Sequence, residues 1–159
     1  MKTTIAWLGR RLSGRPDSEH GQALIRLALL FVVLVFLLWT DRSGPRPPAY
    51  EQVMALVITG FCIGSGIVGW ILARPGTSHP RRVVGMLSDY GLMGAAMTVM
   101  GGPIGWVYVL ILWVTVGNGL RFGTRYLYAA MSMAALSFGG VLLLTPYWHA
   151  NLSLGVGLL

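Results

Sequence analysis

The stretch that decides the fold runs from Tyr90 to Leu120 and reads YGLMGAAMTVMGGPIGWVYVLILWVTVGNGL. It contains no Asp, Glu, Lys or Arg, as expected of a chain segment that lies in the hydrocarbon core of a lipid bilayer. Backbone amides cannot stay unpaired there, so the stretch must be helical. One helix of this length would reach about 46 Å, against a hydrocarbon thickness of about 30 Å. The turn signal Gly101-Gly102-Pro103 therefore predicts two short helices, 83–100 and 104–119, joined by a tight hairpin.

The composition of the whole chain also indicates a membrane protein. Of its 159 residues, 55% are hydrophobic and only 11% are charged, against about 25% charged residues in a typical soluble domain. Twelve Lys and Arg outnumber five acids, but these cations lie in short segments between apolar runs, where membrane proteins keep them. We therefore expect no nucleic-acid partner. The single cysteine, Cys62, excludes a disulfide framework within the chain.

Further apolar runs flank the decisive stretch. Three of them cover residues 23–40, 52–73 and 126–148, and a fourth opens at 152 and is not finished at 159. Each of the first three is long enough to cross a bilayer as a helix. The predicted fold is an all-α polytopic helical bundle with five complete transmembrane helices and the start of a sixth. The unfinished run indicates a piece of a longer protein, cut before further modules.

The charges of the connecting segments favour the hairpin at 101–103. With the hairpin, the basic segments 1–22, 74–82 and 121–125 all fall on one side of the membrane, and the charge-balanced segment 41–51 falls on the other. Without it, the basic segments divide between the two sides. Because cytoplasmic loops carry the excess of Lys and Arg, this distribution predicts a cytoplasmic N-terminus.

Residues 1–22 are expected to form a separate interfacial segment before the transmembrane domain at 23–159. Residues 3–12 place an apolar stripe of Ile5, Leu8 and Leu12 on one face of a short amphipathic helix, which would lie on anionic lipid. Asp17 or Ser18 would then cap the first transmembrane helix, with Glu19 in its first turn. Two interpretations stay open: anchoring and capping, or a direct sensing role for Asp17, Ser18, Glu19 and His20.

Asp89 is the one acid inside an apolar segment. An ionisable group at that depth is costly and needs a partner, for which Arg26, Arg121 and Arg125 are the candidates. Two interpretations remain open here as well, an ion pair that locks one helix to another and a ligand site.

The sequence shows no phosphate-binding loop, metal-ligand cluster or pairing of a nucleophile with a base. We therefore expect no enzymatic activity, metal or cofactor in this chain. Small residues recur at four-residue spacing in three of the predicted helices, at Gly60, Gly64, Gly91, Ala95, Ala135 and Gly139. Such faces allow close packing within the bundle, or a dimer seam.

Four stretches resemble the N-terminal membrane input domains of the bacterial hybrid histidine kinases that sense the diffusible signal factor. They are WLGRRLSGRPDSEH at 7–20, HPRRVVGMLSDY at 79–90, WVTVGNGLRFG at 113–123 and LTPYWHAN at 144–151. The resemblance covers the whole chain. It implies a multi-pass protein of the bacterial inner membrane whose dimerisation, ATP-binding, receiver and phosphotransfer modules would follow Leu159. ATP and Mg²⁺ would be needed only in that kinase part.

The resemblance also implies a signal, a cis-2-unsaturated medium-chain fatty acid that controls virulence through the phosphorelay. The segment before the first span would sense it, which assigns the role to Asp17, Ser18, Glu19, His20 and Gln22, with Arg15 as a partner for the carboxylate. The polar residues expected to relay the signal within the membrane are Arg26, Asp89, Asn118, Arg121 and Arg125. The family is usually drawn with five spans and an external sensing segment, which differs from the charge-based topology.

The expected partners are therefore the fatty acid, membrane lipids and a second copy held through the kinase part. Two other classes of function stay open. A small transporter or channel would need a broken helix at midplane or a file of polar residues along a pore. A purely structural membrane anchor needs neither.

Overall fold

A computed structural model describes residues 19–43, 49–101 and 104–159, and all of the regular elements in these ranges are helices. They are α2 (Glu19–Ser43), α3 (Tyr50–Ala73), α4 (His79–Met100), α5 (Val107–Phe122), α6 (Thr124–Leu144), α7 (Pro146–Ala150) and α8 (Leu152–Leu158). The all-α prediction is confirmed for these residues. The predicted amphipathic helix at 3–12 and the caps at Asp17 and Ser18 lie outside them.

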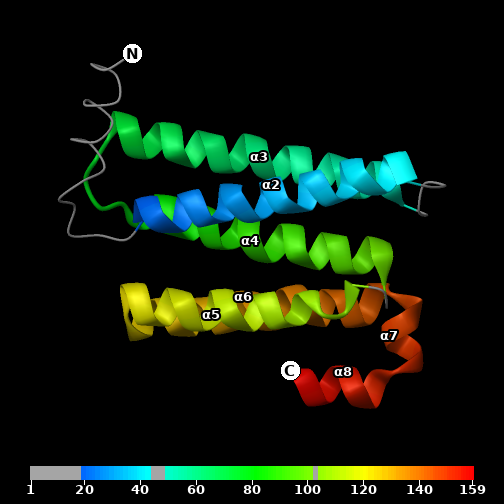
Figure 1. Ribbon diagram of the computed structural model, residues 1–159. Helices are drawn as coiled ribbons and strands as arrows, with labels where there is room; N and C mark the ends of the chain where they lie inside the picture. The colour runs from blue at the N-terminus through cyan, green and yellow to red at the C-terminus, as the bar shows by residue number, and fades with distance from the viewer. Residues whose placement is uncertain (1–18, 44–48, 102–103) are drawn as a thin grey trace.

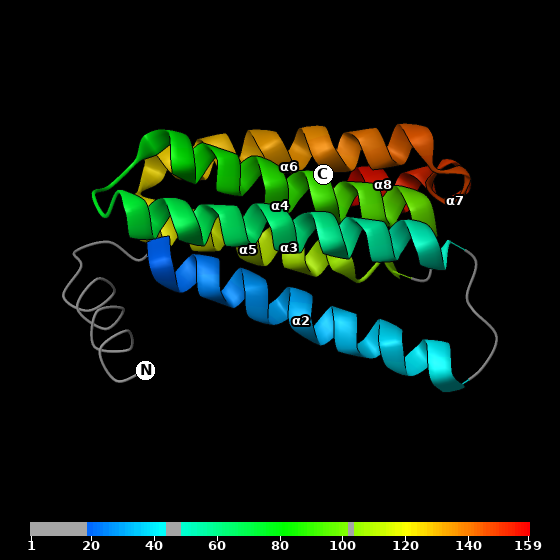
Figure 2. The same ribbon diagram turned by 90° about the horizontal axis from the view of Figure 1, so that it is seen from above.

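Each long helix runs antiparallel to the long helix before it in the chain, as Figures 1 and 2 show. α4 is central and contacts α3, α5 and α6, while α2 packs on α3 and α5 packs on α6. The starts of α2, α4 and α6 and the ends of α3 and α5 lie together at one end of the bundle (Figure 1). Arg74, Arg81, Arg82, Arg121 and Arg125 belong to that end, which we call the basic end.

Within the described residues, four helices are long and apolar enough to cross a membrane: Glu19–Trp39 of α2, and α3, α4 and α6. The expected five complete spans are not confirmed, because α5 has only 16 residues. At 1.5 Å per residue α5 is about 24 Å long, which is short of a hydrocarbon core about 30 Å thick. The helix predicted at 104–119 has the same length, so α5 lies three residues further along the chain than predicted.

The hairpin predicted at 101–103 is confirmed at the residues that the structure describes. α4 ends at Met100, and Gly101 adopts a φ of 63°, in the left-handed region that glycine enters without a Cβ penalty. The Gly101 N–H donates to the Met97 carbonyl at 2.9 Å and closes the helix. α5 then runs back along α4 (Figure 1), so the apolar stretch is divided where the sequence placed the turn.

The helix expected at 126–148 ends earlier. α6 stops at Leu144 because Pro146 has no N–H to continue the helical hydrogen bonds, and Pro146–Ala150 forms the separate helix α7. The chain then turns back along the bundle as α8 (Figure 1). The Tyr108 hydroxyl donates to the Leu158 carbonyl, and Gly155 lies against the Leu142 side chain. α8 lies where the sequence predicts the start of a sixth transmembrane helix, and it has seven residues.

The best-packed part of the bundle lies among α4, α5 and α6. Met86, Tyr90, Ile111, Phe138 and Trp148 are almost fully buried there. The outer faces of the helices carry many exposed large apolar side chains, such as Phe36, Leu136 and Leu143, as expected of surfaces that meet lipid.

Candidate functional site: a polar network at the start of α2

The first turns of α2 carry a polar face made of Glu19, Gln22 and Arg26. The spacing of three and four residues places these side chains above one another on one side of the helix. That side meets α4 and α5, whereas other positions of the same turns, such as Leu24 and Ile25, are exposed. The start of α2 is therefore attached to α4 and α5 through polar groups.

Glu19 binds two arginines from the start of α4. Its Oε2 accepts from Arg81 Nε at 2.8 Å and also from Arg81 Nη2, and its Oε1 accepts from Arg82 Nε at 2.5 Å. The backbone N–H of Ser78 lies 3.4 Å from Oε1. The Glu19 and Arg81 side chains are only 4% and 2% exposed, so this is a buried ion pair.

Arg81 also fixes the loop between α3 and α4. Its Nη1 donates to the Arg74 carbonyl at 3.0 Å and its Nη2 donates to the Gly76 carbonyl at 2.7 Å. All three guanidinium nitrogens of Arg81 therefore have acceptors, which a fully buried guanidinium requires. Arg81 is a structural residue that ties α2, the loop and α4 into one unit.

Arg82 has different surroundings. Its guanidinium carbon lies 4.4 Å from the centre of the Phe122 ring and 5.4 Å from that of Tyr126, within the range of cation–π attraction. The side chain is 13% exposed, and its Nε makes the contact with Glu19. His79 stacks on the Tyr126 ring and its Nδ1 is hydrogen-bonded to the Tyr126 hydroxyl. Arg82 thereby joins α4 to the turn between α5 and α6.

Two turns deeper, Arg26 pairs with Asp89. The Arg26 Nε and Nη2 groups donate to the two carboxylate oxygens, the second at 2.6 Å, and Nη2 also lies 3.2 Å from the Gly85 carbonyl. The two side chains are 10% and 13% exposed. The fork geometry is that of a bidentate arginine–carboxylate pair. A partner for Asp89 was expected, and of the three candidates the structure selects Arg26.

Gln22 lies between these two ion pairs and reaches α5. Its Nε2 donates to Asn118 Oδ1 at 3.3 Å, and Asn118 Nδ2 in turn donates to the Val114 carbonyl at 2.8 Å. Asn118 is completely buried. The structure thus brings together two residues that the sequence assigned to separate groups, Gln22 to sensing and Asn118 to the relay.

A second polar connection links α4 to α5 and α6. The hydroxyl groups of Tyr90 and Thr115 are hydrogen-bonded at 2.8 Å, and Ser137 donates to the Tyr90 carbonyl at 2.7 Å. Tyr90 directly follows Asp89. A change at the Arg26–Asp89 pair therefore has a short physical route to α5 and α6.

Two hollows lie near these groups. A void of about 20 Å³ is lined by Glu19, Gln22, Arg26, Arg81, Arg82 and Gly85, with Ile67 and Ile71 as an apolar wall. It holds about one water molecule.

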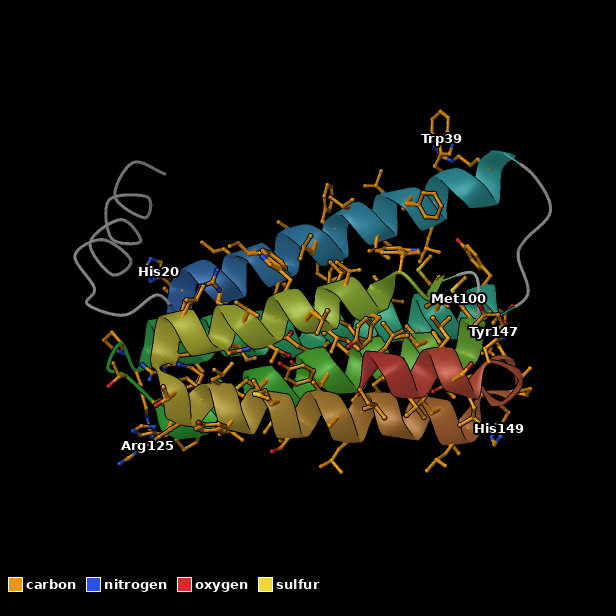
Figure 3. All side chains as sticks on the ribbon, turned by 90° about the horizontal axis from the view of Figure 1, so that it is seen from below. His20, Trp39, Met100, Arg125, Tyr147 and His149 are labelled. Carbon is orange, nitrogen blue, oxygen red and sulfur yellow. The ribbon has the colours of Figure 1, made fainter. Side chains whose placement is uncertain are left out.

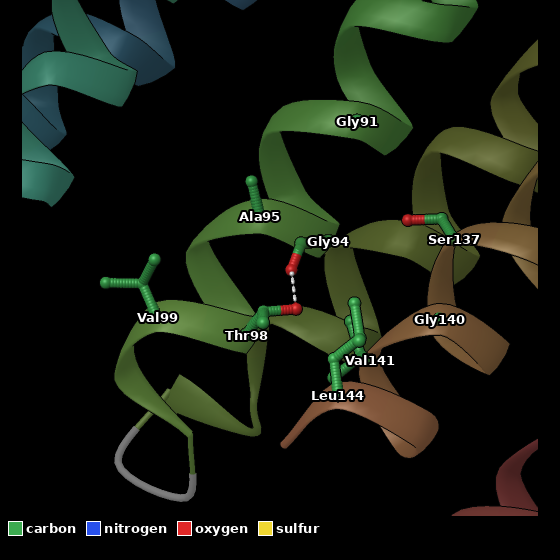
Figure 4. A pocket seen from close by; sticks show the side chains of 9 residues that line it. All are labelled: Gly91, Gly94, Ala95, Thr98, Val99, Ser137, Gly140, Val141 and Leu144. Carbon is green, nitrogen blue, oxygen red and sulfur yellow. Dashed lines mark hydrogen bonds between the residues drawn. The ribbon is translucent and has the colours of Figure 1, made fainter.

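An open groove of about 430 Å³ lies between α4 and α6 (Figure 4), lined mainly by small residues such as Gly91, Gly94, Ala95 and Gly140. Its Thr98 hydroxyl is used locally, donating to the Gly94 carbonyl at 3.0 Å.

The remaining predicted site residues do not join the network. Arg15, Asp17 and Ser18 lie outside the described residues. His20 lies at the start of α2 (Figure 3), and its Nδ1 is buried with no partner among the described residues. Arg121 and Arg125 are exposed at the basic end (Figure 3 labels Arg125), so neither pairs with Asp89.

Sequence reasoning missed the roles of Arg81, Arg82 and Tyr90. The two arginines were counted as cations of a basic loop, but the structure places them in the first turn of α4 and turns them inward to Glu19. A usable signal existed, since Glu19 is the one acid in the segments assigned to the basic side apart from Asp17. The network can hold a carboxylate between guanidinium groups, as it holds Glu19. Among the described residues, no cluster of His, Cys, Asp and Glu is arranged to hold a metal.

Comparison with known proteins identifies relatives of the chain. It is 44% identical over 162 aligned residues to the sensory/regulatory protein RpfC of Xanthomonas campestris pv. campestris, in each of two strains. The alignment covers all of this chain and 22% of the length of those proteins. No family model and no solved structure matches. The resemblance indicated by the sequence motifs is thus confirmed: the chain is homologous over its full length to a part of the sensory/regulatory protein RpfC.

Proposed function

We propose that this chain is the membrane input domain of a sensor histidine kinase, that it binds a cis-2-unsaturated medium-chain fatty acid, and that binding shifts α2 against the rest of the bundle. The similarity to a sensory/regulatory protein supports a sensing role. The kinase, its ATP and Mg²⁺, and dimerisation through the kinase part belong to this proposal. So does a multi-pass position in the bacterial inner membrane, which the four long apolar helices support.

The observation that carries the proposal is the way α2 is attached. Along α3, α2 is held by apolar contacts, for example Leu27 and Leu30 against Gly64 and Gly60. Towards α4 and α5 it is held by polar contacts of Glu19, Gln22 and Arg26 in its first turns. An anionic ligand near residues 17–22 therefore acts on the contacts that fix α2 relative to α4 and α5.

A ligand shifts an equilibrium only by its differential affinity for the two packings. A fatty acid meets this requirement if its carboxylate binds arginine in one packing, while in the other the arginines are bound by Glu19 and Asp89. The acyl chain then contributes affinity by lying among apolar helices, at about 0.8 kcal/mol for each buried methylene group. The carboxylate of the ligand thus selects one of the two helix packings, and the acyl chain determines how tightly the ligand binds.

A transporter or channel is less well supported. The charged side chains of the network, Glu19, Arg26, Arg81, Arg82 and Asp89, are paired with one another, and the void lined by this network holds about one water molecule. A structural anchor would need no polar network of this extent. The sensing proposal accounts for both the network and the similarity to RpfC.

The test is calorimetry on the purified chain in lipid nanodiscs, titrated with cis-2-dodecenoic acid and with its uncharged methyl ester. We expect saturable binding of the acid and a loss of at least about tenfold in affinity for the ester, because one charge-assisted hydrogen bond is lost. Arg15→Gln should weaken binding of the acid more than Lys2→Gln, which removes a cation from the same segment. Equal affinities for acid and ester would mean nonspecific partition of a lipid and would end the sensing proposal. Equal effects of the two variants would exclude only Arg15 as the partner of the carboxylate.

A further inference from the structure

We propose that Arg82, supported by Arg81, is the carboxylate-binding site of this domain, that Glu19 occupies this site in the unliganded protein, and that a fatty-acid carboxylate binds there by exchange with Glu19. This inference rests on the proposed function and names the residues that would receive the ligand. Neither arginine was a candidate ligand residue from the sequence.

The first argument is the charge of the buried network. Arg26, Arg81 and Arg82 face two carboxylates, Glu19 and Asp89, so the network carries one positive charge in excess. The Arg26–Asp89 pair is balanced, which leaves the excess on the two arginines that share Glu19. A guanidinium without its own counter-ion is unfavourable in an apolar environment. The start of α4 is therefore a place where an additional anion is attracted.

The second argument separates the two arginines. Each guanidinium nitrogen of Arg81 already has an acceptor, either Glu19 or a backbone carbonyl, and the side chain is 2% exposed. Arg82 contacts Glu19 through Nε and otherwise lies over the faces of Phe122 and Tyr126. Its guanidinium is held in place by these two rings and by a hydrogen bond that it donates to the Tyr126 side chain, and these contacts do not depend on Glu19. Arg82 is therefore the residue that can change its carboxylate partner without unfolding the loop that Arg81 holds.

The third argument is the volume of the void, which decides the mode of binding. About 20 Å³ suffices for a water molecule but not for a carboxylate with its adjoining carbons. A ligand cannot simply be added to the network, so it must replace a group that is already there. Glu19 is that group, since its Oε1 contacts Arg82.

The apolar wall of the void indicates which carboxylate fits. Ile67 and Ile71 of α3 line it, and both are almost fully buried. A carboxylate that carries an alkyl chain can therefore leave its charge at Arg82 and place its first methylene groups against α3. When Glu19 leaves Arg82, α2 is detached from α4 at this point. The ligand therefore binds the packing with Glu19 released more tightly than the packing with Glu19 bound, as the proposed function requires.

Two variants distinguish exchange from direct contact. Glu19→Gln removes the competing charge and should tighten the binding of cis-2-dodecenoic acid by about tenfold, because Arg82 no longer has an anionic partner. If Glu19 were instead a ligand-contacting residue, the same variant would weaken binding. Arg82→Gln should weaken binding by about tenfold or more. Arg82→Lys keeps the charge but not the planar guanidinium, so its affinity for the acid should lie between those of Arg82→Gln and the unchanged chain.

The matched control is Arg125→Gln, which removes an exposed arginine from the same end of the bundle. It should leave binding within about twofold of the unchanged chain. Circular dichroism and the melting temperature of each variant show whether it is folded, and the Glu19→Gln variant should regain stability when the acid is added. These affinities, measured in phosphatidylcholine nanodiscs, would support a carboxylate site at Arg82.

Other outcomes overturn the inference in distinct ways. Equal binding by Arg82→Gln and Arg125→Gln, with the unchanged chain still binding the acid, removes this site and leaves the proposed function standing. Loss of phosphatidylglycerol binding in Arg82→Gln, with fatty-acid binding unaltered, assigns Arg82 to a lipid headgroup instead. No binding of the acid by the unchanged chain removes both proposals.

Discussion

Arg26 of α2 and Asp89 of α4 lie 63 positions apart in the chain and meet in a bidentate ion pair inside the bundle. The pair lies two helical turns beyond the ion pairs of Glu19 with Arg81 and Arg82, which also fix the first turns of α2 to α4. Both side chains are largely buried, so removal of either one leaves a charge without its partner in an apolar environment.

A double-mutant cycle measures this pair. Asp89→Asn alone and Arg26→Gln alone should each lower the free energy of unfolding by about 3–5 kcal/mol, since each leaves an unpaired buried charge. The double variant should lose little more than either single one, giving a coupling energy of about 3 kcal/mol or more. Denaturation in mixed micelles provides the measurement, with Arg121→Gln as a control that should lie within about 0.5 kcal/mol of the unchanged chain. Additive losses would show that the two charges do not interact.

The contact between α4 and α6 gives a prediction with a control in the same helix. A Cβ at Gly94 would collide with the Ser137 hydroxyl, which now donates to the Tyr90 carbonyl. Gly94→Ala should therefore turn the hydroxyl away and lower stability by about 1 kcal/mol, the contribution of one hydrogen bond. Gly91→Ala meets no atom within 4 Å and should be neutral or stabilising, by up to about 1 kcal/mol.

Ser137→Ala tests the reason for that effect. In the Ser137→Ala background the collision is absent, so Gly94→Ala should have almost no further effect. The same loss of stability in both backgrounds would mean that the cost arises elsewhere, for example from a displaced helix. Melting temperatures of the four proteins in one detergent are sufficient for the comparison.

The side of the membrane on which the basic end lies can be tested by cysteine labelling. In a Cys62→Ala background, a membrane-impermeant thiol reagent applied to intact cells should modify a cysteine at Arg46 or His149 and none at Lys2 or His79. The positive-inside rule places the second pair, with the basic end, in the cytoplasm. Modification at Lys2 in intact cells would place the sensing segment outside, as the family is usually drawn.

Much of the fold could be predicted from the sequence because helices in lipid follow local rules. The charge-free stretch and the Gly-Gly-Pro signal located the turn at Gly101, and the end of α4 at Met100 agrees with them. The end of α6 was placed too late because Tyr147 and Trp148 extend the apolar run. The proline at 146 was the better signal, since it cannot continue the helical hydrogen bonds.

The site was less accessible to sequence reasoning because it depends on how helices rotate against one another. Asp89 could be recognised as needing a partner, but its choice of Arg26 over Arg121 follows from the packing of α2 near α4. Glu19 was interpreted either as an acid in the first turn of its own helix or as a sensing residue, and not as the partner of another helix. Its partners Arg81 and Arg82 lie on another helix, and no local pattern shows that they point inward.

The central claim, that a fatty-acid carboxylate detaches the start of α2 from the bundle, is tested most directly by a distance between spin labels at Ile25 and Arg125. Both positions are exposed in the first turns of α2 and α6, and Cys62→Ala provides the background. With cis-2-dodecenoic acid, double electron–electron resonance should show this distance lengthen or its distribution broaden, while labels at Leu87 and Leu136 of α4 and α6 report no change. The methyl ester should have no effect on either pair. An unaltered distance between positions 25 and 125 in protein that calorimetry shows to be saturated with the acid would contradict the account.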